Sequence, residues 1–153
     1  MVGTWQVVAS RAAALDAVTA AGFDPERTVV LEADPGLGAP GAAPGSARFA
    51  WTGRQSARVE VLAARAGLLL VRNTYDPHWH ATVDGKPAPV LPADSFLQAV
   101  PVPAGSHVVT LAYDDPSIGV GLLGSVVALA ILAGAAIATA VGGRRRRRDV
   151  AGA

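Results

Sequence analysis

The chain contains no cysteine, so neither disulfide bonds nor thiol chemistry can contribute to its fold or its activity. It has no G-x-S-x-G sequence, and no local motif places a serine beside a base. Gly36-Leu37-Gly38 lies in a proline-rich loop and does not open a helix, which argues against a phosphate-binding loop. The sequence therefore gives no indication of a catalytic centre.

Basic residues are scarce before residue 118. Residues 1–117 carry eight Lys and Arg against eleven Asp and Glu, whereas residues 144–153 carry five Arg and one Asp. The net charge of +1 thus combines a mildly acidic domain with a basic tail. An acidic domain is not expected to bind nucleic acid, because nucleic-acid affinity depends on neutralising phosphates.

Charge is absent altogether from residues 118–143, where Ser125 and Thr139 are the only polar side chains. As a helix this stretch would extend about 39 Å, against about 30 Å for the hydrocarbon core of a bilayer. Directly after it come Arg144, Arg145, Arg146, Arg147 and Arg148. An apolar span closed by a basic block is typical of a membrane helix whose C-terminal end stays in the cytoplasm. The alternative is a buried core helix, which seldom runs this far without a charge.

This interpretation predicts an extracytoplasmic domain at 1–116, a transmembrane helix at 117–143 and a cytoplasmic tail at 144–153, in the inner membrane. Met1–Ala9 has no basic segment followed by a long apolar run, so we expect no secretory signal there. Either the C-terminal helix takes the domain across, or the chain is the end of a longer membrane protein. Asp114–Ser117 leaves little slack, which would hold the domain near the bilayer.

One short helix is expected near the N-terminus. Ser10 is a suitable N-cap for a helix over Arg11–Ala21, and Gly22 is suited to end it. The predicted apolar face consists of Ala14, Leu15 and Val18. Strands are expected on either side, at 4–9 and 28–31, and residues 34–46 are rich enough in Pro and Gly to be a loop.

From residue 47 the pattern predicts only strands. Arg58 and Glu60 alternate with Val59 and Val61, the period of a half-buried strand, while the apolar run of 67–73 suits a central strand. Hairpins are predicted at Asp84-Gly85 and at Pro103-Ala104-Gly105. The predicted strands are 47–52, 56–64, 67–73, 78–83, 86–90, 96–102 and 107–113. Short strands at this spacing favour a mainly β fold, a β-sandwich with one N-terminal helix.

Residues 75–113 contain a recognisable order of motifs. They comprise Tyr75, Pro77 and Trp79, then Val83-Asp84-Gly85, then Ala99, Val100, Val102, Pro103, Gly105, His107 and Tyr113. This order resembles the C-terminal segment of the bacterial YfhO membrane-protein family, in which a membrane helix follows the final strand. Upstream, Phe23-Asp24-Pro25 and Thr28–Glu32 fit the lead-in to that domain, so the resemblance covers nearly the whole chain.

The resemblance implies a module without an active site of its own. Full-length relatives are polytopic and look like GT-C-type glycosyltransferases, whose catalytic acidic residues lie between N-terminal membrane helices that this chain does not contain. We therefore expect no enzyme and no cofactor, but a part accessory to, or a fragment of, a cell-envelope glycosyltransferase that uses lipid-linked sugars. The implied partners are the lipid bilayer and a polytopic glycosyltransferase or other membrane helices.

Tyr75 and Trp79 are the candidates for a contact with glycan or with a partner's interface. Their alternative roles are packing of the sheet and anchoring at the membrane interface, where Tyr and Trp are enriched. The rival function is an independent membrane-anchored glycan-binding module with an aromatic groove around Trp79.

Three further groups of residues have weaker functional interpretations. His78 and His80 share a strand face and could ligate a metal with Asp76 or His107, as in a metal-dependent hydrolase, although a solvated face is the preferred explanation because nothing in the sequence shows convergent ligands. Asp114-Asp115 could bind a cation or a partner's arginine, or be solvated. A ridge of small residues favours helix association unless composition alone explains it; it comprises Ala130, Gly134, Ala138 and Gly142.

Overall fold

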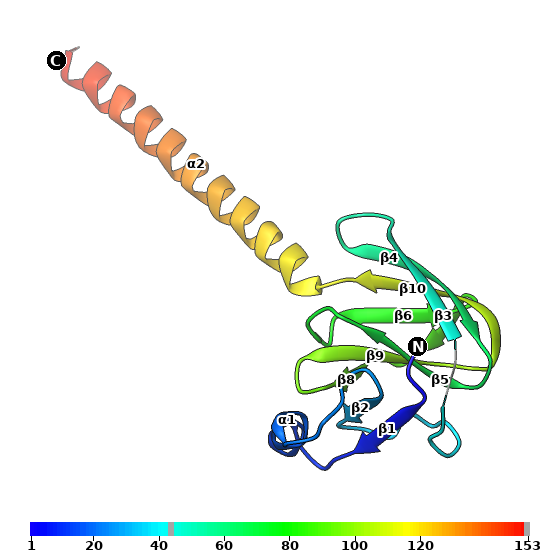
Figure 1. Ribbon diagram of the computed structural model, residues 1–153. Coiled ribbons are helices and arrows are strands. Elements are labelled where there is room, and N and C mark those ends of the chain that lie inside the picture. Colours follow the sequence, from blue (N-terminus) through cyan, green and yellow to red (C-terminus); the bar gives the residue numbers. More distant parts are fainter. Residues whose placement is uncertain (43–44, 152–153) are drawn as a thin grey trace. The chain divides into compact units, whose positions relative to one another are not determined.

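Strands dominate the chain up to residue 114, as the alternating sequence patterns predicted (Figure 1). The computed structural model describes residues 1–42 and 45–151, with side chains described except at 118 and 135–151. The chain divides into two units, Met1–Asp114 and Asp115–Ala153. The first contains the strands and helix α1, and the second contains helix α2, which spans Pro116–Ala151.

The strands form two five-stranded sheets (Figure 1). Sheet A has the order β1 (Thr4–Val7), β2 (Thr28–Leu31), β8 (Leu91–Ala93), β9 (Leu97–Val102) and β5 (Gly67–Val71). Sheet B has the order β3 (Gly45–Trp51), β4 (Ser56–Ala63), β10 (Gly105–Tyr113), β6 (Trp79–Val83) and β7 (Lys86–Ala88). Among the strand pairs of the described residues, only β1–β2 is parallel. The chain passes from one sheet to the other five times, which ties the two sheets together.

The main apolar core lies between the two sheets, so the predicted mainly β, two-sheet fold is confirmed. In β4 the alternation is as predicted, with Val59 and Val61 buried and Arg58 and Glu60 exposed. Sheet A contributes the opposing side chains, which include those of Leu69, Val71, Val100 and Val102. A second apolar cluster on the other face of sheet A comprises Val29, Leu31, Leu68, Leu91, Ala93 and Ala99.

Strand β5 belongs to both clusters, which explains its continuous apolar sequence. Leu69 and Val71 face the core between the sheets, while Leu68 and Leu70 face the second cluster. The prediction of a central strand was nevertheless wrong, because β5 is the last strand of sheet A. A continuous apolar sequence indicates that both faces of a strand are buried, but it does not indicate whether the strand has one or two neighbouring strands in its sheet.

Helix α1 spans Arg11–Thr19 and begins as predicted. The Ser10 side chain accepts a hydrogen bond from the Ala13 N–H at 3.2 Å. Its predicted end was wrong, because the helix ends at the cap Ala20, and Gly22, with φ +91°, lies in the turn that follows. The predicted apolar face was also wrong in part, since Leu15 is 51% exposed whereas Ala14 is fully buried.

The hairpin at Asp84-Gly85 is confirmed. Both residues have positive φ, 51° and 79°, and Val83 pairs with Lys86 across the turn. The second predicted hairpin was wrong, because Pro103 and Ala104 lead from β9 in sheet A to β10 in sheet B. A short turn between two predicted strands is compatible both with a hairpin and with a connection from one sheet to the other.

Gln98 of β9 is a polar residue in the core between the sheets. It is fully buried, and neither its side-chain oxygen nor its nitrogen has a hydrogen-bond partner among the described residues. We expect Gln98→Met to raise the free energy of unfolding by about 1–2 kcal/mol, because it removes two unsatisfied polar atoms at nearly constant volume. Urea unfolding measures this. Gln98→Asn keeps the amide and removes a methylene, so it should lower stability, and an equal gain from both variants would contradict the explanation.

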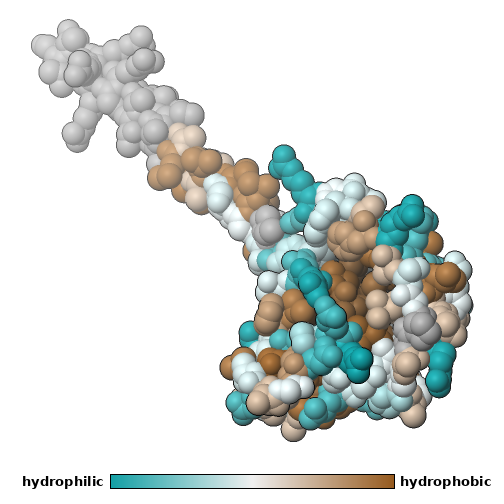
Figure 2. All heavy atoms as spheres, viewed as in Figure 1, coloured by the Kyte–Doolittle hydropathy of each residue, from teal (hydrophilic) through white to brown (hydrophobic). Residues whose placement is uncertain are grey.

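Helix α2 begins with a capping arrangement. Asp115 Oδ1 accepts a hydrogen bond from the Ser117 N–H at 2.9 Å, and Pro116 occupies the first helical position. The part of α2 with described side chains is largely apolar (Figure 2). Over the described residues, no helix is both long and apolar enough to cross a membrane. The predicted span of 117–143 continues beyond residue 134, and that continuation, the arginine block 144–148 and half of the small-residue ridge lie outside the residues with described side chains.

Candidate functional site

The predicted aromatic contact site lies where β6 begins and β10 ends. Trp79 is the register partner of Tyr113, and their ring centroids are 5.3 Å apart at an interplanar angle of 65°. Trp79 is half-buried and packs against the core between the sheets. Tyr75 is also half-buried, and its N–H donates a hydrogen bond to the Phe96 carbonyl at 2.8 Å. The partner of Trp79 is thus Tyr113, a contact that strand assignment by sequence did not identify.

The turn before β6 is organised by Asp76. Its carboxylate accepts a hydrogen bond from the His78 N–H at 2.9 Å and lies 2.8 Å from His78 Nδ1. The Trp79 N–H donates to the Asp76 carbonyl, and the Asp114 N–H donates to the His78 carbonyl. Asp76 and His78 therefore shape the backbone that presents Trp79 to Tyr113.

The three histidines do not converge. His80 is exposed and lies opposite Ala112 on β10, whereas His107 is five positions away along that strand, at about 17 Å. Among the described residues, no group of three His, Asp or Glu side chains could hold a metal ion. This separation contradicts the alternative of a metal-dependent hydrolase centre, because the register of β6 with β10 keeps His107 away from His80.

Asp84 and His107 form a pair that the sequence did not predict. His107 Nδ1 lies 2.6 Å from Asp84 Oδ2, and its Nε2 lies 3.1 Å from the Ala104 carbonyl oxygen. Asp84 Oδ1 accepts the Val108 N–H at 2.8 Å, and the Asp84 N–H donates to the Val108 carbonyl. The pair therefore ties the β6–β7 turn to the start of β10.

The surroundings of this pair favour its charged form. Both imidazole nitrogens of His107 face oxygen acceptors, which a doubly protonated ring satisfies with two N–H donors. The hydrogen bond with Asp84 and then that with Ala104 raise the pKa of His107 above 6.5. The hydrogen bonds from His107 and then Val108 lower the pKa of Asp84 below 3.8. Gly105, with φ +128°, makes room, since a Cβ there would lie 3.1 Å from His107 Nε2.

We expect the pair to make stability depend on pH. The raised pKa of His107 gives stability that is complete below pH 6.5 and is lost as pH rises through the folded-state value. The lowered pKa of Asp84 gives stability that is complete above pH 3.8 and is lost on acidification below it. The loss caused by His107→Gln should thus be largest between these limits and shrink at alkaline pH, as measured by urea unfolding. His80→Gln, on an exposed strand position, is the matched control for the replacement of a histidine by glutamine.

A cleft of about 390 Å³ opens between the edge strands β3 and β5. Its lining comprises Ala47, Phe49, Trp51, Val59 and residues 69–73. Phe49 and Trp51 are 41% and 58% exposed, and their rings meet edge to face at 5.1 Å. The sequence predicted the strand β3. Phe49 and Trp51 are two positions apart and so lie on one face of that strand, which could have indicated that this face exposes large apolar side chains.

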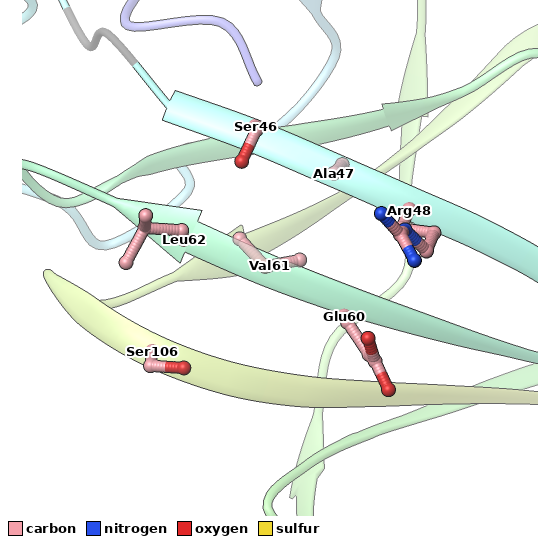
Figure 3. A pocket seen from close by; sticks show the side chains of 7 residues that line it. All are labelled: Ser46, Ala47, Arg48, Glu60, Val61, Leu62 and Ser106. Atoms are coloured by element: carbon pink, nitrogen blue, oxygen red, sulfur yellow. The ribbon is translucent and has the colours of Figure 1, made fainter.

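A depression of about 560 Å³ lies on β3, β4 and β10 (Figure 3). Its side chains include those of Ser46, Leu62 and Ser106 at one end and, two residues along the strands, those of the register partners Arg48 and Glu60 (Figure 3). Opposite charges that face one another across paired strands stabilise a sheet. The depression therefore lies among exposed strand residues, and its charged pair is explained by strand pairing.

Part of the chain matches a known protein family. The family described as bacterial membrane protein YfhO matches residues 50–125, which include β4 to β10 and the first part of α2. No curated protein and no solved structure matches the chain. The matched region contains both residue pairs described above, Trp79 with Tyr113 and Asp84 with His107. The family assignment and the motif order agree, and the chain belongs to the YfhO family of bacterial membrane proteins.

Proposed function

We propose that this chain is an extracytoplasmic β module held by a single membrane helix, accessory to, or a fragment of, a cell-envelope glycosyltransferase that uses lipid-linked sugars. The observation that carries the proposal is the family match, which runs from the end of β3 through β10 into α2. In the β-domain, the carboxylates of Asp76 and Asp84 accept hydrogen bonds from backbone N–H groups. Such a domain is suited to positioning the substrate of a membrane enzyme or to packing on that enzyme.

The apolar surface of α2 supports membrane anchoring. The helix exposes between 51% and 73% of the side chains of Val120, Leu122, Leu123, Val126, Val127, Leu129, Ile131 and Leu132. The Ser125 hydroxyl donates to the Gly121 carbonyl within the helix at 2.9 Å, so it needs no partner from water. Such a surface is costly in water and favourable in hydrocarbon. The five arginines at 144–148 would hold the far end of the helix in the cytoplasm.

The roles of the acidic residues and histidines support a module without catalysis. Asp76 orders the turn before β6, Asp84 joins a turn to β10, and Asp115 caps α2. Each of these carboxylates accepts backbone N–H groups, which is a structural use. A glycan-binding module remains the second candidate, and the aromatic surface that favours it is Phe49 with Trp51, since Trp79 packs against the core.

The proposal is tested by expressing the full chain in a bacterium and exposing intact spheroplasts to protease. We expect the β-domain to be cleaved without lysis and the chain to stay with the membranes until detergent is added. A domain protected from protease in intact spheroplasts would contradict the topology. A chain that dissolves on lysis without detergent would contradict the anchor.

A further inference from the structure

Within the part of the chain that the structure describes, no strand lies opposite the inner face of β3. Phe49 is the register partner of Val59, and Trp51 is the register partner of Ala57, so these pairs share a face of sheet B. Val59 and Ala57 are buried in the core between the sheets, whereas Phe49 and Trp51 are largely exposed. The core is therefore open along one side, where sheet A stops at β5 and sheet B continues to β3.

Strand β5 presents a backbone edge to this opening. The backbone of Leu68 exchanges two hydrogen bonds of 2.8 Å with Val2, which lies on the side of β5 away from β9. On the β9 side, the register partner of Leu68 is Pro101, which has no N–H to donate. Because alternate residues of a strand point their backbone groups to the same side, Leu70 directs its N–H and C=O outward as well. Leu70 also lines the cleft with Phe49 and Trp51.

The bridge to Val2 gives the direction in which this edge accepts a strand. It is antiparallel, so a strand that continues its line along β5 would meet Leu70 and then Arg72. That path follows the cleft that Arg72 and Asn73 line at its far end. The edge itself is apolar and carries neither of the usual protections of an open edge, a lysine or a proline.

We propose that the cleft between β3 and β5 is a docking site for an extended peptide strand of another protein. The strand would add antiparallel to β5, pair with the backbone of Leu70 and cover Phe49 and Trp51 with alternate apolar side chains. Its N-terminal end would lie beside Arg72, where an acidic residue complements the guanidinium charge. A helix or a sugar would cover the aromatic rings but leave the backbone edge unpaired. This inference goes beyond the proposed function, since it does not depend on membrane anchoring.

The test uses the full chain in detergent and a labelled probe peptide that begins with Glu and continues with alternating Val and Thr. Fluorescence polarisation should show saturable binding, and the peptide with its Glu moved to the C-terminal end should bind more weakly. We expect Trp51→Ala and Leu70→Pro each to weaken binding by about tenfold or more, since they remove the apolar floor and the edge donor. Leu62→Ala is the control, because Leu62 is 60% exposed on β4 and does not line the cleft.

If the Leu70→Pro variant does not fold, hydrogen exchange on the unaltered chain still tests whether the peptide pairs with β5. In the unaltered chain, the probe should slow exchange of the Leu70 amide. Absence of probe binding, or binding that leaves this amide unprotected, would overturn the proposal. A dimer that Trp51→Ala dissociates would assign the cleft to a second copy. Quenching of Trp51 by a chitin oligosaccharide without protection at Leu70 would assign it to glycan, and either result also overturns the proposal.

Discussion

Replacing Val126 and Leu129 of α2 together with aspartate is expected to release the chain from the membrane fraction. Both side chains are exposed, 56% and 66%, so the change should leave the β-domain intact. A central Asp costs about 2.5–3.5 kcal/mol in a membrane helix, and two of them offset most or all of the roughly 3–7 kcal/mol that the Leu, Ile and Val residues of 118–143 supply. The measurement is the share of the chain that sediments with membranes after a high-salt wash.

Leu62→Asp is the matched control for this experiment. Leu62 is as exposed as the helix residues, at 60%, but it lies on β4 in the first unit of the chain. It should remain with the membranes if α2 is the anchor. Equal release by the control and the double variant would indicate a general loss of folding, and retention of the double variant would contradict anchoring by α2.

Asp94→Ala is expected to lower the free energy of unfolding by about 2–4 kcal/mol. Asp94 Oδ1 accepts the Val30 N–H at 2.8 Å, and the Asp94 N–H donates to the Val30 carbonyl at 2.8 Å, which joins β8 to β2 in sheet A. Alanine would leave the buried Val30 N–H without an acceptor, at about 1–3 kcal/mol. It would also adopt φ 48° without a side chain that supports this conformation. Urea unfolding measures the loss.

Asp94→Asn separates the hydrogen bond from the charge. Asparagine keeps an acceptor for Val30 and tolerates positive φ, so it should retain most of the stability. Burial raises the pKa of Asp94, opposed by the hydrogen bond from Val30. A carboxyl whose folded-state pKa is raised loses stability as pH rises above 3.8 through that value, so the advantage of asparagine should grow over this interval. A large loss with asparagine at neutral pH would show that the charge itself stabilises β8.

Four of the residues that carry the family resemblance meet in two pairs. Trp79 and Tyr113 meet edge to face at one end of the β6–β10 ladder, and Asp84 and His107 hydrogen-bond at the other. The interpretation of Asp84-Gly85 as a turn was correct and local. The link from Asp84 to His107 joins residues 23 positions apart, and no periodicity in the sequence encodes that contact.

What the sequence determined by itself was the set of features that depend on near neighbours. The alternation in β4 and β10, the positive φ angles at Asp84-Gly85 and the Ser10 cap follow from side chains a few positions apart. Only the tertiary structure decided that β5 is an edge strand, that Pro103 leads across the sheets, and that Phe49 and Trp51 face an open cleft. The alternation of a strand sequence indicates which side chains are buried. The choice of neighbouring strand depends on backbone hydrogen bonds with residues far away in the sequence, and every strand has the same backbone donors and acceptors for these bonds.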